Sequence, residues 1–458
     1  MRATVTKKSW AVRASKPAAV LVAAALLSSC AHNEEPSTGT SASKSLTQKA
    51  ESAALTAAGG KKIGGKLSLI GVNAGAEGAV IESTLKPFED ATGIDIDYTG
   101  SSDANTLIQT RVDAGNAPDV VNLPNAGSLA TYAKAGKLVP LTFMDQSKLK
   151  SDFAPTLLSS ATVDGKLYGI WNEVDNFMIW YNAKTYKGPK APADWAALQK
   201  WAKSASSGDT APWCMGLASG AASGVSGAQF ISNLFLYESG PEKLKQFAEG
   251  KLPFTSPEVA SAFKLFGKIA TSSKMVKGGA TAALNTPTVE AGNGMFSSPQ
   301  KCSMLGWGNY AGGLITAANA KVKPVTDLDF FGWPAVNKDY AKSQLVSGHV
   351  MYAFNDTPQV RAFMKYYASS EAQSLLADSG HWVVANQDVT TATYPNALIK
   401  KSAAQYKAAD SVSLSPVSQL PAPVVMALYK GIVAYVQNPG SLNSILAGIE
   451  KTRTGATS

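Results

Sequence analysis

Two carboxylates separated by one residue give this sequence its clearest chemical signal. They are Glu173 and Asp175 in the run W-N-E-V-D, with Trp171 and Asn172 directly before them. Because side chains alternate between the two faces of an extended chain, Glu173 and Asp175 are expected on one face as paired hydrogen-bond acceptors. A fully buried strand would not take two carboxylates without partners, so the run favours the lining of a polar cleft. A half-exposed strand with Trp171 on its core face is the alternative.

Aromatic residues at loop-like positions would complement these acceptors. A sugar ring has an apolar C–H face that stacks on a flat side chain, and its hydroxyls bind carboxylates and amides. Trp307 is the strongest stacking candidate because glycines flank it, and Tyr310 lies three residues further on. Trp171 is a third candidate because Asn172 follows it. A core position is the favoured interpretation of Trp213, Trp333 and Trp382.

Two further acidic residues follow predicted strands. Glu77 lies in the loop after an apolar strand over 67–72, and Asp103 lies in the loop after an alternating strand over 94–98. In open α/β sheets, ligands bind beyond the carboxyl ends of the strands. Glu77, Asp103 and the run 171–175 are therefore expected to converge on one rim.

Familiar catalytic and cofactor motifs are absent from the sequence, which contains no G-x-S-x-G, H-E-x-x-H, P-loop or G-x-G-x-x-G. We therefore expect no cofactor and no metal. Three histidines are present, His32, His349 and His381, and ordinary packing is the expected role of the last two. The enzymatic alternative is a glycoside hydrolase that uses Glu173 and Asp175 as its acid/base pair.

Strand and helix patterns alternate along the chain from residue 66. Strands are predicted over 67–72, 94–98, 119–123, 167–170, 303–310, 329–336 and 348–354, and an amphipathic helix over 357–377. Such alternation is typical of βαβ units, so the fold class is α/β, with mainly parallel sheets flanked by helices. At 458 residues the chain exceeds the usual size of one core, and two domains are expected.

The N-terminus has the features of an export signal. Residues 1–29 hold five basic residues, no acidic residue and an apolar stretch over 18–27 that is too short to span a bilayer. Cys30 follows in L-S-S-C, which resembles a bacterial lipobox and predicts a lipidated cysteine at the mature N-terminus. An ordinary cleavage site with an incidental cysteine is the alternative. Residues 30–63, rich in Ser, Thr, Ala and Lys, are predicted to be a flexible tether.

Removal of such a signal peptide lowers the net charge from +9 to +4. No basic run with interleaved aromatic residues occurs, so no nucleic-acid partner is expected. The two remaining cysteines, Cys214 and Cys302, are expected to oxidise together outside the cytoplasm. Two unpaired buried thiols are the alternative, and metal binding is disfavoured.

Four stretches of this sequence resemble the bacterial ABC-transporter solute-binding lipoproteins of the carbohydrate class, the family of maltose-binding protein. They are A-P-D-V-V with A-G-K-L-V-P-L over 117–141, L-Y-G-I-W-N-E-V-D-N-F-M-I-W-Y-N over 167–182, K-C-S-M-L-G-W-G-N-Y over 301–310 and S-S-E-A-Q over 369–373. The resemblance extends over about 66–451. The run W-C-M-G-L-A-S-G-A-A-S-G over 213–224 is similar to a branch of α-glucoside and oligosaccharide binders in which the paired cysteines recur.

The resemblance implies the two-lobe periplasmic-binding-protein type II fold with a three-stranded hinge. The implied lobes are 64–174 with 346–385, and 175–345 with 386–458. Asp175 falls at the family's acidic sugar ligand, and Trp307 and Tyr310 fall at or near its stacking platform. The chain departs from the maltose branch at Leu123–Asn125, Met426 and Ala427, so the resemblance does not identify the sugar.

The family further implies a monomeric receptor that a lipid anchor holds at the outer face of the cytoplasmic membrane. It would capture a sugar or oligosaccharide by hinge closure and deliver it to an ABC-type permease, without catalysing a reaction. The residues expected to bind hydroxyls are Glu77, Asp103, Asn172, Glu173 and Asp175, and those expected to stack are Trp171, Trp307 and Tyr310. Besides the hydrolase, a receptor for a non-sugar solute and an adhesive lipoprotein remain alternatives.

Overall fold

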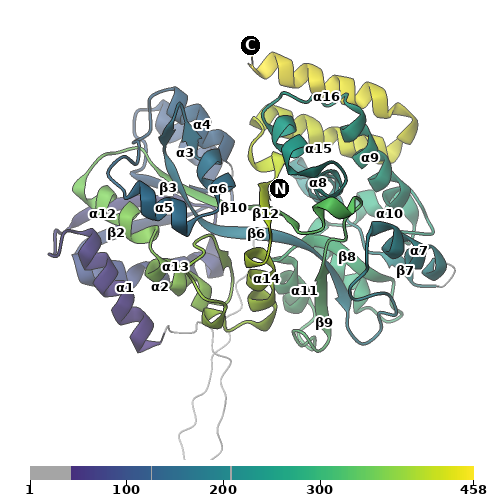
Figure 1. Cartoon of the computed structure of the whole chain (residues 1–458), viewed down its shortest axis with the longest axis horizontal. Helices are drawn as coiled ribbons and strands as arrows, with labels where there is room; N and C mark the ends of the chain where they lie inside the picture. The colour runs from purple at the N-terminus through teal and green to yellow at the C-terminus, as the bar shows by residue number, and fades with distance from the viewer. Residues whose placement is uncertain (1–42, 125, 207–208, 458) are drawn as a thin grey trace, which may run out of the picture. The chain divides into compact units, whose positions relative to one another are not determined.

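One long strand connects the two parts of the folded chain. The structure is a computed structural model that describes residues 43–124, 126–206 and 209–457. Strand β6 runs unbroken over Gly169–Asn182, so the polar run 171–175 lies inside a strand of 14 residues. In Figure 1, β6 passes from one group of helices to the other. The predicted signal peptide 1–29, Cys30 and His32 lie outside the described residues.

Strands and helices alternate over the first half of the described chain, and helices dominate its end. The remaining strands are β1 Gly65–Gly71, β2 Ile94–Gly100, β3 Val120–Leu123, β4 Thr162–Val163, β5 Lys166–Leu167, β7 Ala211–Trp213, β8 Cys302–Gly308, β9 Leu328–Gly332, β10 Ser343–Ala353, β11 Val383–Val384 and β12 Ser411–Leu414. The α-helices are α1 Lys44–Ala57, α2 Gly75–Thr92, α3 Ala104–Asp113, α4 Ala126–Lys134, α5 Gln146–Asp152, α6 Pro155–Ser160, α7 Trp195–Ala205, α8 Val225–Ala248, α9 Pro257–Ala270, α10 Gly279–Asn285, α11 Ala311–Ala318, α12 Pro358–Tyr367, α13 Ser370–Asp378, α14 Ala397–Lys407, α15 Ala422–Gln437 and α16 Leu442–Thr457.

The α/β class is confirmed, but the sheet is mixed and not mainly parallel. Its order is β2-β1-β3-β10-β6-β8-β7, with β9 and β11 also paired to β6, and β12 paired to β10. Strand β1 is parallel to β2 and β3, as the βαβ pattern predicts. Strands β6 and β10 are antiparallel to each other, and β10 is antiparallel to β3. The parallel pattern breaks here because the chain crosses in β6 and returns beside it in β10.

Buried apolar side chains form two large clusters that meet at β6 and β10. Along β6 the chain leaves the first cluster after residue 174 and enters the second at 177. Along β10 the change falls between residues 345 and 346. The chain passes from the first cluster to the second once more between Leu414 and Leu420. The resemblance implied a lobe boundary after residue 385. Within 386–414, Tyr406 packs in the first cluster, whereas Leu398 packs in a third, smaller cluster with Trp307 and Phe330.

The prediction of a flexible tether over 30–63 is wrong for residues 44–57, which form α1. The side chain of Ser43 caps this helix by accepting a hydrogen bond from the backbone N–H of Leu46. Ala50 and Ala54 are fully buried, and the helix packs on α2, α12 and α13 (Figure 1). The small alanine side chains form a helical stripe that lets backbones approach closely. The helical spacing of the buried alanines was missed because a Ser- and Ala-rich composition is also typical of a linker.

The amphipathic helix predicted over 357–377 is two helices. Thr357 caps α12 and Pro358 occupies its first turn, as expected. The helix ends at Tyr367, and Ser369 starts α13 by accepting a hydrogen bond from the backbone N–H of Ala372. A second capping residue, Ser369, thus starts a new helix within a stretch whose apolar pattern is continuous. No helix of the described residues is both long and apolar enough to cross a bilayer.

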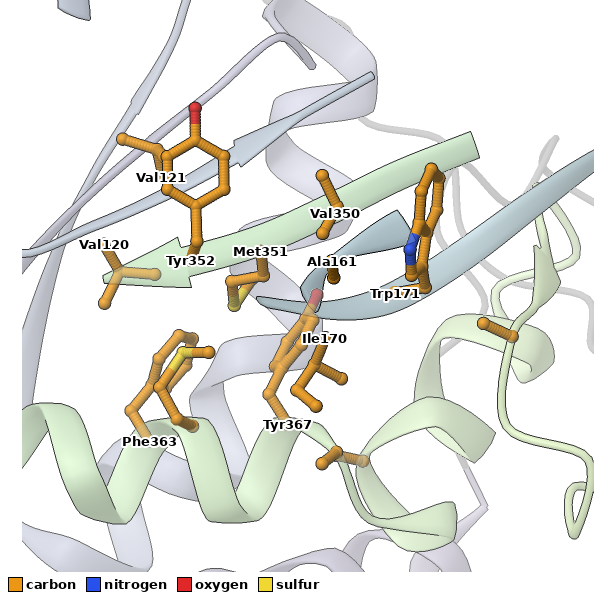
Figure 2. Close-up of a cluster of buried hydrophobic side chains, with 14 of the residues drawn as sticks. Val120, Val121, Ala161, Ile170, Trp171, Val350, Met351, Tyr352, Phe363 and Tyr367 are labelled. Carbon is orange, nitrogen blue, oxygen red and sulfur yellow. The ribbon is translucent and has the colours of Figure 1, made fainter. Parts of the chain in front are cut away.

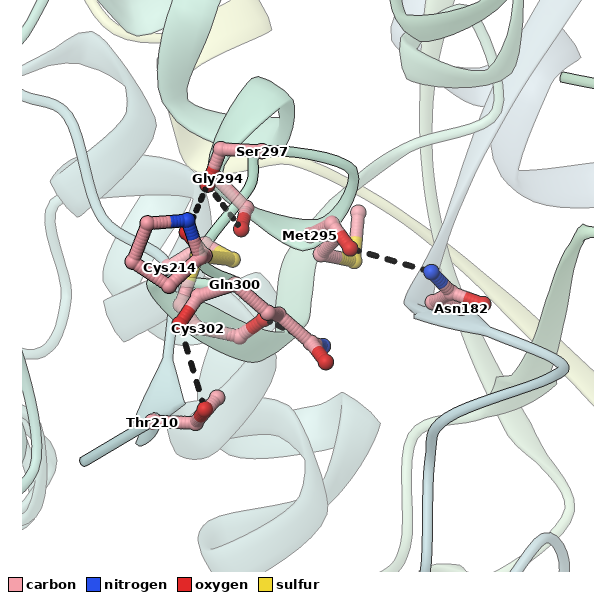
Figure 3. The surroundings of a disulfide bond; sticks show 9 residues. Asn182, Thr210, Cys214, Gly294, Met295, Ser297, Gln300 and Cys302 are labelled. Carbon is pink, nitrogen blue, oxygen red and sulfur yellow. Dashed lines mark hydrogen bonds between the residues drawn. A yellow bond between two sulfur atoms is a disulfide. The ribbon is translucent and has the colours of Figure 1, made fainter. Parts of the chain in front are cut away.

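A disulfide joins Cys214 and Cys302 at the end of the sheet formed by β7 and β8 (Figure 3). Their Cα atoms are 5.2 Å apart, and the two residues are separated by 88 positions in sequence. The backbone N–H of Cys214 also donates to the carbonyl of Met304 at 2.7 Å. A Cβ atom on Gly294 would lie 2.6 Å from the sulfur of Cys302, so the close approach requires glycine there. The bond ties β8, which carries Trp307, to the segment after β7.

Candidate functional site

The two carboxylates of the polar run face the returning strand β10. In the antiparallel register, Glu173 lies opposite His349, and Asp175 lies opposite Ser347. Residues two apart on one strand and their direct partners on the next strand share a face of the sheet. All four side chains therefore gather on one face, at the place where the two buried clusters meet.

An ion pair connects the centre of this group. Nδ1 of His349 lies 2.5 Å from Oε1 of Glu173, and both side chains are largely buried. The second carboxylate oxygen of Glu173 is buried without a hydrogen-bond partner. The hydroxyl of Ser347, at 3.4 Å, is the one hydrogen-bond partner of Asp175 in the described part of the chain. The site thus contains carboxylate oxygens that the protein itself leaves almost unpaired.

Close backbone packing holds these strands together. Gly348 has a φ of 143°, and a Cβ atom there would lie 2.1 Å from the carbonyl oxygen of Glu173. The register shifts between His349 and Val350, which leaves Asn172 as an extra residue on β6. Such a bulge turns the strand locally and redirects its side chains. Only glycine fits at 348 without moving the carboxylates.

Burial and charge together alter the ionisation of the site. Burial, and then the charge of Glu173, raises the pKa of Asp175 to about 7. Burial disfavours the charged imidazole of His349, but the carboxylates of Glu173, Asp175 and Glu77 together outweigh it and raise the pKa of His349. Glu77 adds a further negative field to both groups. The site is therefore acidic, with one imidazole as its internal cation.

Helix α2 brings Glu77 to this group. Glu77 lies in the first turn of α2, directly after β1, and the side-chain amide of Asn73 donates to it at 3.3 Å. The hydroxyl of Tyr98, on β2, donates to the carbonyl of Asn73 at 2.7 Å. The ends of neighbouring parallel strands thus supply polar groups beside the carboxylates, as the sheet rule predicts.

The other half of the molecule contributes two aromatic rings. The backbone N–H of Asn309 donates to the carbonyl of Asn176 at 2.9 Å, which places Tyr310 beside β6. The charge of Asp175 acts on Tyr310, whose pKa burial and this charge raise. Trp307 and Tyr310 pack edge to face with their centroids 5.1 Å apart. Trp307 is 7% exposed, so it offers little free surface in this conformation.

One glutamine on α8 orients both rings. Oε1 of Gln229 accepts hydrogen bonds from Nε1 of Trp307 at 2.8 Å and from the hydroxyl of Tyr310 at 3.1 Å. The ring of Tyr310 lies over Gly308, where a Cβ atom would meet it at 2.4 Å. Tyr310 is thus the ring that lies beside Asp175, and Trp307 packs against Tyr310.

The prediction that Trp171 offers a stacking face is wrong for this structure. Its side chain is fully buried in the first cluster, where it lies near Val350 and Ala161 (Figure 2). Its Nε1 donates to the carbonyl of Leu157 at 2.9 Å and to the hydroxyl of Ser160 at 3.1 Å. The structure therefore supports the alternative, in which Trp171 is a core residue.

Asn172 and Asp103 differ in their surroundings. Asn172 is fully buried at the bulge, and neither side-chain amide atom has a hydrogen-bond partner among the described residues. Asp103 is exposed at the start of α3, with no side-chain capping bond. Of the predicted site residues, the structure therefore brings together Glu77, Glu173, Asp175, Trp307 and Tyr310, and leaves Asp103 at the surface.

Sequence reasoning missed three groups of this site. His349 was assigned to ordinary packing, and Ser347 and Gln229 were not singled out. Each one acts through a partner distant in the sequence, and only the strand register or the helix packing reveals it. Trp213 and Trp333 lie in the second cluster, and Trp382 is partly buried against the first, so none of these three joins the site.

One strand, β6, carries the two carboxylates and joins the two apolar clusters, as in a protein of two lobes. Residues 83–406 match the family described as bacterial extracellular solute-binding protein, and the chain belongs to this family. It is 30% identical over 378 residues to the osmoprotective compounds-binding protein GgtB of Synechocystis sp., covering 81% of this chain and 88% of that protein.

Two further comparisons agree with this assignment. Over 405 residues the chain is 27% identical to the alpha-glucosides-binding periplasmic protein AglE of Rhizobium meliloti, covering 85% of this chain and 87% of that protein. A solved structure of a chitin oligosaccharide binding protein superposes with a TM-score of 0.69 at 22% identity, covering 85% of this chain and 98% of that one. The latter similarity supports the two-lobe fold.

Replacement of Gln229 by methionine should disturb the paired rings. The side chain keeps its length but loses the acceptor, so Trp307 Nε1 and the Tyr310 hydroxyl lose their shared partner. Leaving buried donors unpaired is expected to lower the free energy of unfolding by about 1–3 kcal/mol, measured by urea denaturation. Gln246→Met is the matched control, because Gln246 lies in the second segment of α8, after Gly240, and its side chain bonds only to Glu242 among the described residues. Equal stability of the two variants would contradict the positioning role.

Proposed function

We propose that this protein is an extracellular receptor that binds a sugar or oligosaccharide and delivers it to an ABC importer. Family membership supports the receptor and importer parts of the proposal. The observation that carries the sugar part is that the carboxylate oxygens of Glu173 and Asp175 have few partners and that Tyr310, which packs against Trp307, lies near Asp175. Carboxylates accept hydrogen bonds from hydroxyls, and aromatic rings cover the C–H face of a sugar.

Hinge closure is the proposed mechanism of capture. Strands β6 and β10 belong to both lobes, so a ligand that contacts residues from both sides favours the closed arrangement. Only the difference in affinity between the open and closed states can move that equilibrium. Glu77 would approach from one lobe, and Trp307 and Tyr310 would approach from the other, with Asp175 between them on the shared strand. The lobe boundaries implied by the resemblance stay part of this proposal, with the third one moved to 414–420.

The residues proposed to bind hydroxyls are Glu77, Asn172, Glu173 and Asp175, with Asp103 at the outer rim. Asn172 supports this assignment because a buried amide without partners costs free energy that a ligand's hydrogen bonds would offset. Trp307 and Tyr310 are proposed to stack. We propose that a monomer suffices and that no bond of the sugar is broken.

A second ligand class is favoured by one specific relative. The name of GgtB refers to osmoprotective compounds, and that protein is 30% identical to this chain. The name of AglE refers to alpha-glucosides. Alpha-glucosides and other osmolytes are therefore the two ligand groups that a screen must separate.

A thermal-shift screen of the mature chain should identify the ligand class. The panel holds maltose, trehalose, sucrose, raffinose, chitobiose and glycine betaine. A ligand at 100 times its Kd stabilises a protein by about 2.7 kcal/mol, so at least one sugar should raise Tm. Asp175→Ala should abolish this shift, whereas Asp97→Ala, at an exposed position of β2, should keep it. A shift with glycine betaine alone would favour the second class, and no shift with any compound would contradict both.

We infer that Cys30 carries a lipid anchor at the outer face of the cytoplasmic membrane. The support is the apolar stretch 18–27 followed directly by L-S-S-C. Two acyl chains give stable membrane attachment, whereas one gives only weak binding. Cys30→Ala should therefore move the folded protein from the membrane fraction to the medium or the periplasm, as measured by immunoblotting of the fractions. An unchanged membrane fraction would contradict the anchor.

We also propose that Cys214 and Cys302 stay oxidised in the exported protein. The bond closes a loop of 88 positions, and it restricts the unfolded chain accordingly. The Cys214→Ser/Cys302→Ser double variant should lose about 4–5 kcal/mol of stability for a loop of this length, as measured by denaturant unfolding. Thiol titration of the unfolded wild type should find neither cysteine free. Two free thiols in the wild type, or equal stability of both proteins, would contradict the proposal.

A further inference from the structure

Two carboxyl groups on β6 share one close cation among the described residues. Glu173 and Asp175 lie on the same face of β6, and the imidazole of His349 contacts Glu173 at 2.5 Å. Asp175 has only the Ser347 hydroxyl at 3.4 Å. Two like charges at such close range in a low dielectric do not both ionise without compensation. The geometry therefore gives the two carboxyl groups different roles.

We propose that Asp175 holds a proton in the empty site and releases it to solvent when a sugar binds, and that His349 is the positioning residue that reserves this role for Asp175 by pairing with Glu173. This inference rests on the proposed sugar-binding function. Binding is a proton exchange: the protonated receptor and the sugar give the complex and one proton taken up by buffer. Sugar hydroxyls then donate to the ionised carboxylate, which makes stronger hydrogen bonds than the neutral acid.

The surroundings of His349 and Asp175 support this exchange. Several ionisable groups on the surrounding elements act on His349, Asp175 or Glu173. They are Glu77 on α2, Tyr98 on β2, Glu173 on β6, Tyr310 at the start of α11 and Tyr367 on α12. Tyr429 on α15 acts on Tyr310. None of these groups is a lysine or an arginine. Burial raises the pKa of each of these tyrosines, so they stay neutral near pH 7.

The direction of the pH dependence follows from the raised pKa of Asp175. In the empty folded protein this pKa is about 7, against 3.8 for an ordinary aspartate side chain. The folded state therefore gains stability from the proton at low pH and loses it as the pH rises to about 7. A ligand that donates to the carboxylate lowers the pKa again. Affinity should therefore rise about tenfold per pH unit up to about pH 7 and level off above it.

Titration calorimetry of the wild-type protein tests the exchange without any variant. The probe is the sugar that gives the largest thermal shift among maltose, trehalose, sucrose, raffinose and chitobiose. Titrations at about pH 6 in two buffers of different ionisation enthalpy should report release of close to one proton per sugar, falling toward zero by about pH 8.5. Binding that releases no proton and keeps a constant Kd from pH 5.5 to 8.5 would overturn the inference and leave the sugar-binding function intact. Absence of binding at every pH would overturn both.

Two variants and one control separate positioning from packing. Asp175→Asn should bind with a Kd that no longer varies across this range, whereas Asp97→Asn, at an exposed position of β2, should keep the wild-type profile. His349→Gln removes the cation, so the midpoint of the Kd profile should move to higher pH. An unchanged midpoint in His349→Gln would overturn the role of His349. Without any ligand, the stability gain of Asp175→Asn over the wild type should grow from pH 4 to pH 7, and a gain that stays constant would contradict the buried proton.

Discussion

The antiparallel pairing of β6 with β10 is the interaction on which the rest of the structure depends. These strands carry the chain from one apolar cluster to the other and back, and their backbone ladder lies in the middle of the sheet, where both halves share it. Gly348 allows the strands to approach so closely that no side chain would fit between them. Any rotation of one half against the other therefore acts on the residues of this pair.

The groups proposed to bind the ligand lie on that ladder or directly beside it. Glu173 and Asp175 point from β6, His349 points from β10, and Tyr310 follows the strand β8 that pairs with β6. Carboxylates with few partners are costly in a folded protein unless a ligand completes their hydrogen bonds. This cost favours ligand binding, because the ligand provides the hydrogen-bond donors that the carboxylates lack in the empty site. A receptor that must release its cargo gains from a site that is not complete on its own.

Much of this arrangement could be predicted from local sequence, and the remainder depends on pairing. The i, i+2 spacing of Glu173 and Asp175 and the glycines around Trp307 indicated two parts of the site. The pairing of His349 with Glu173 could not be predicted, because it depends on a strand register between residues 176 positions apart. Trp171 was predicted to offer a stacking surface because the sequence does not show how β6 pairs with β10. Helix α1 was missed because a stripe of alanines resembles a linker in composition.

The position of a bound sugar tests the central claim most directly. In a crystal structure of the complex, the account predicts sugar hydroxyl oxygens within about 3 Å of the Asp175 carboxylate, with the sugar ring against Tyr310 or Trp307 and with contacts from both halves. A sugar held by one half alone, away from β6 and β10, would contradict the account.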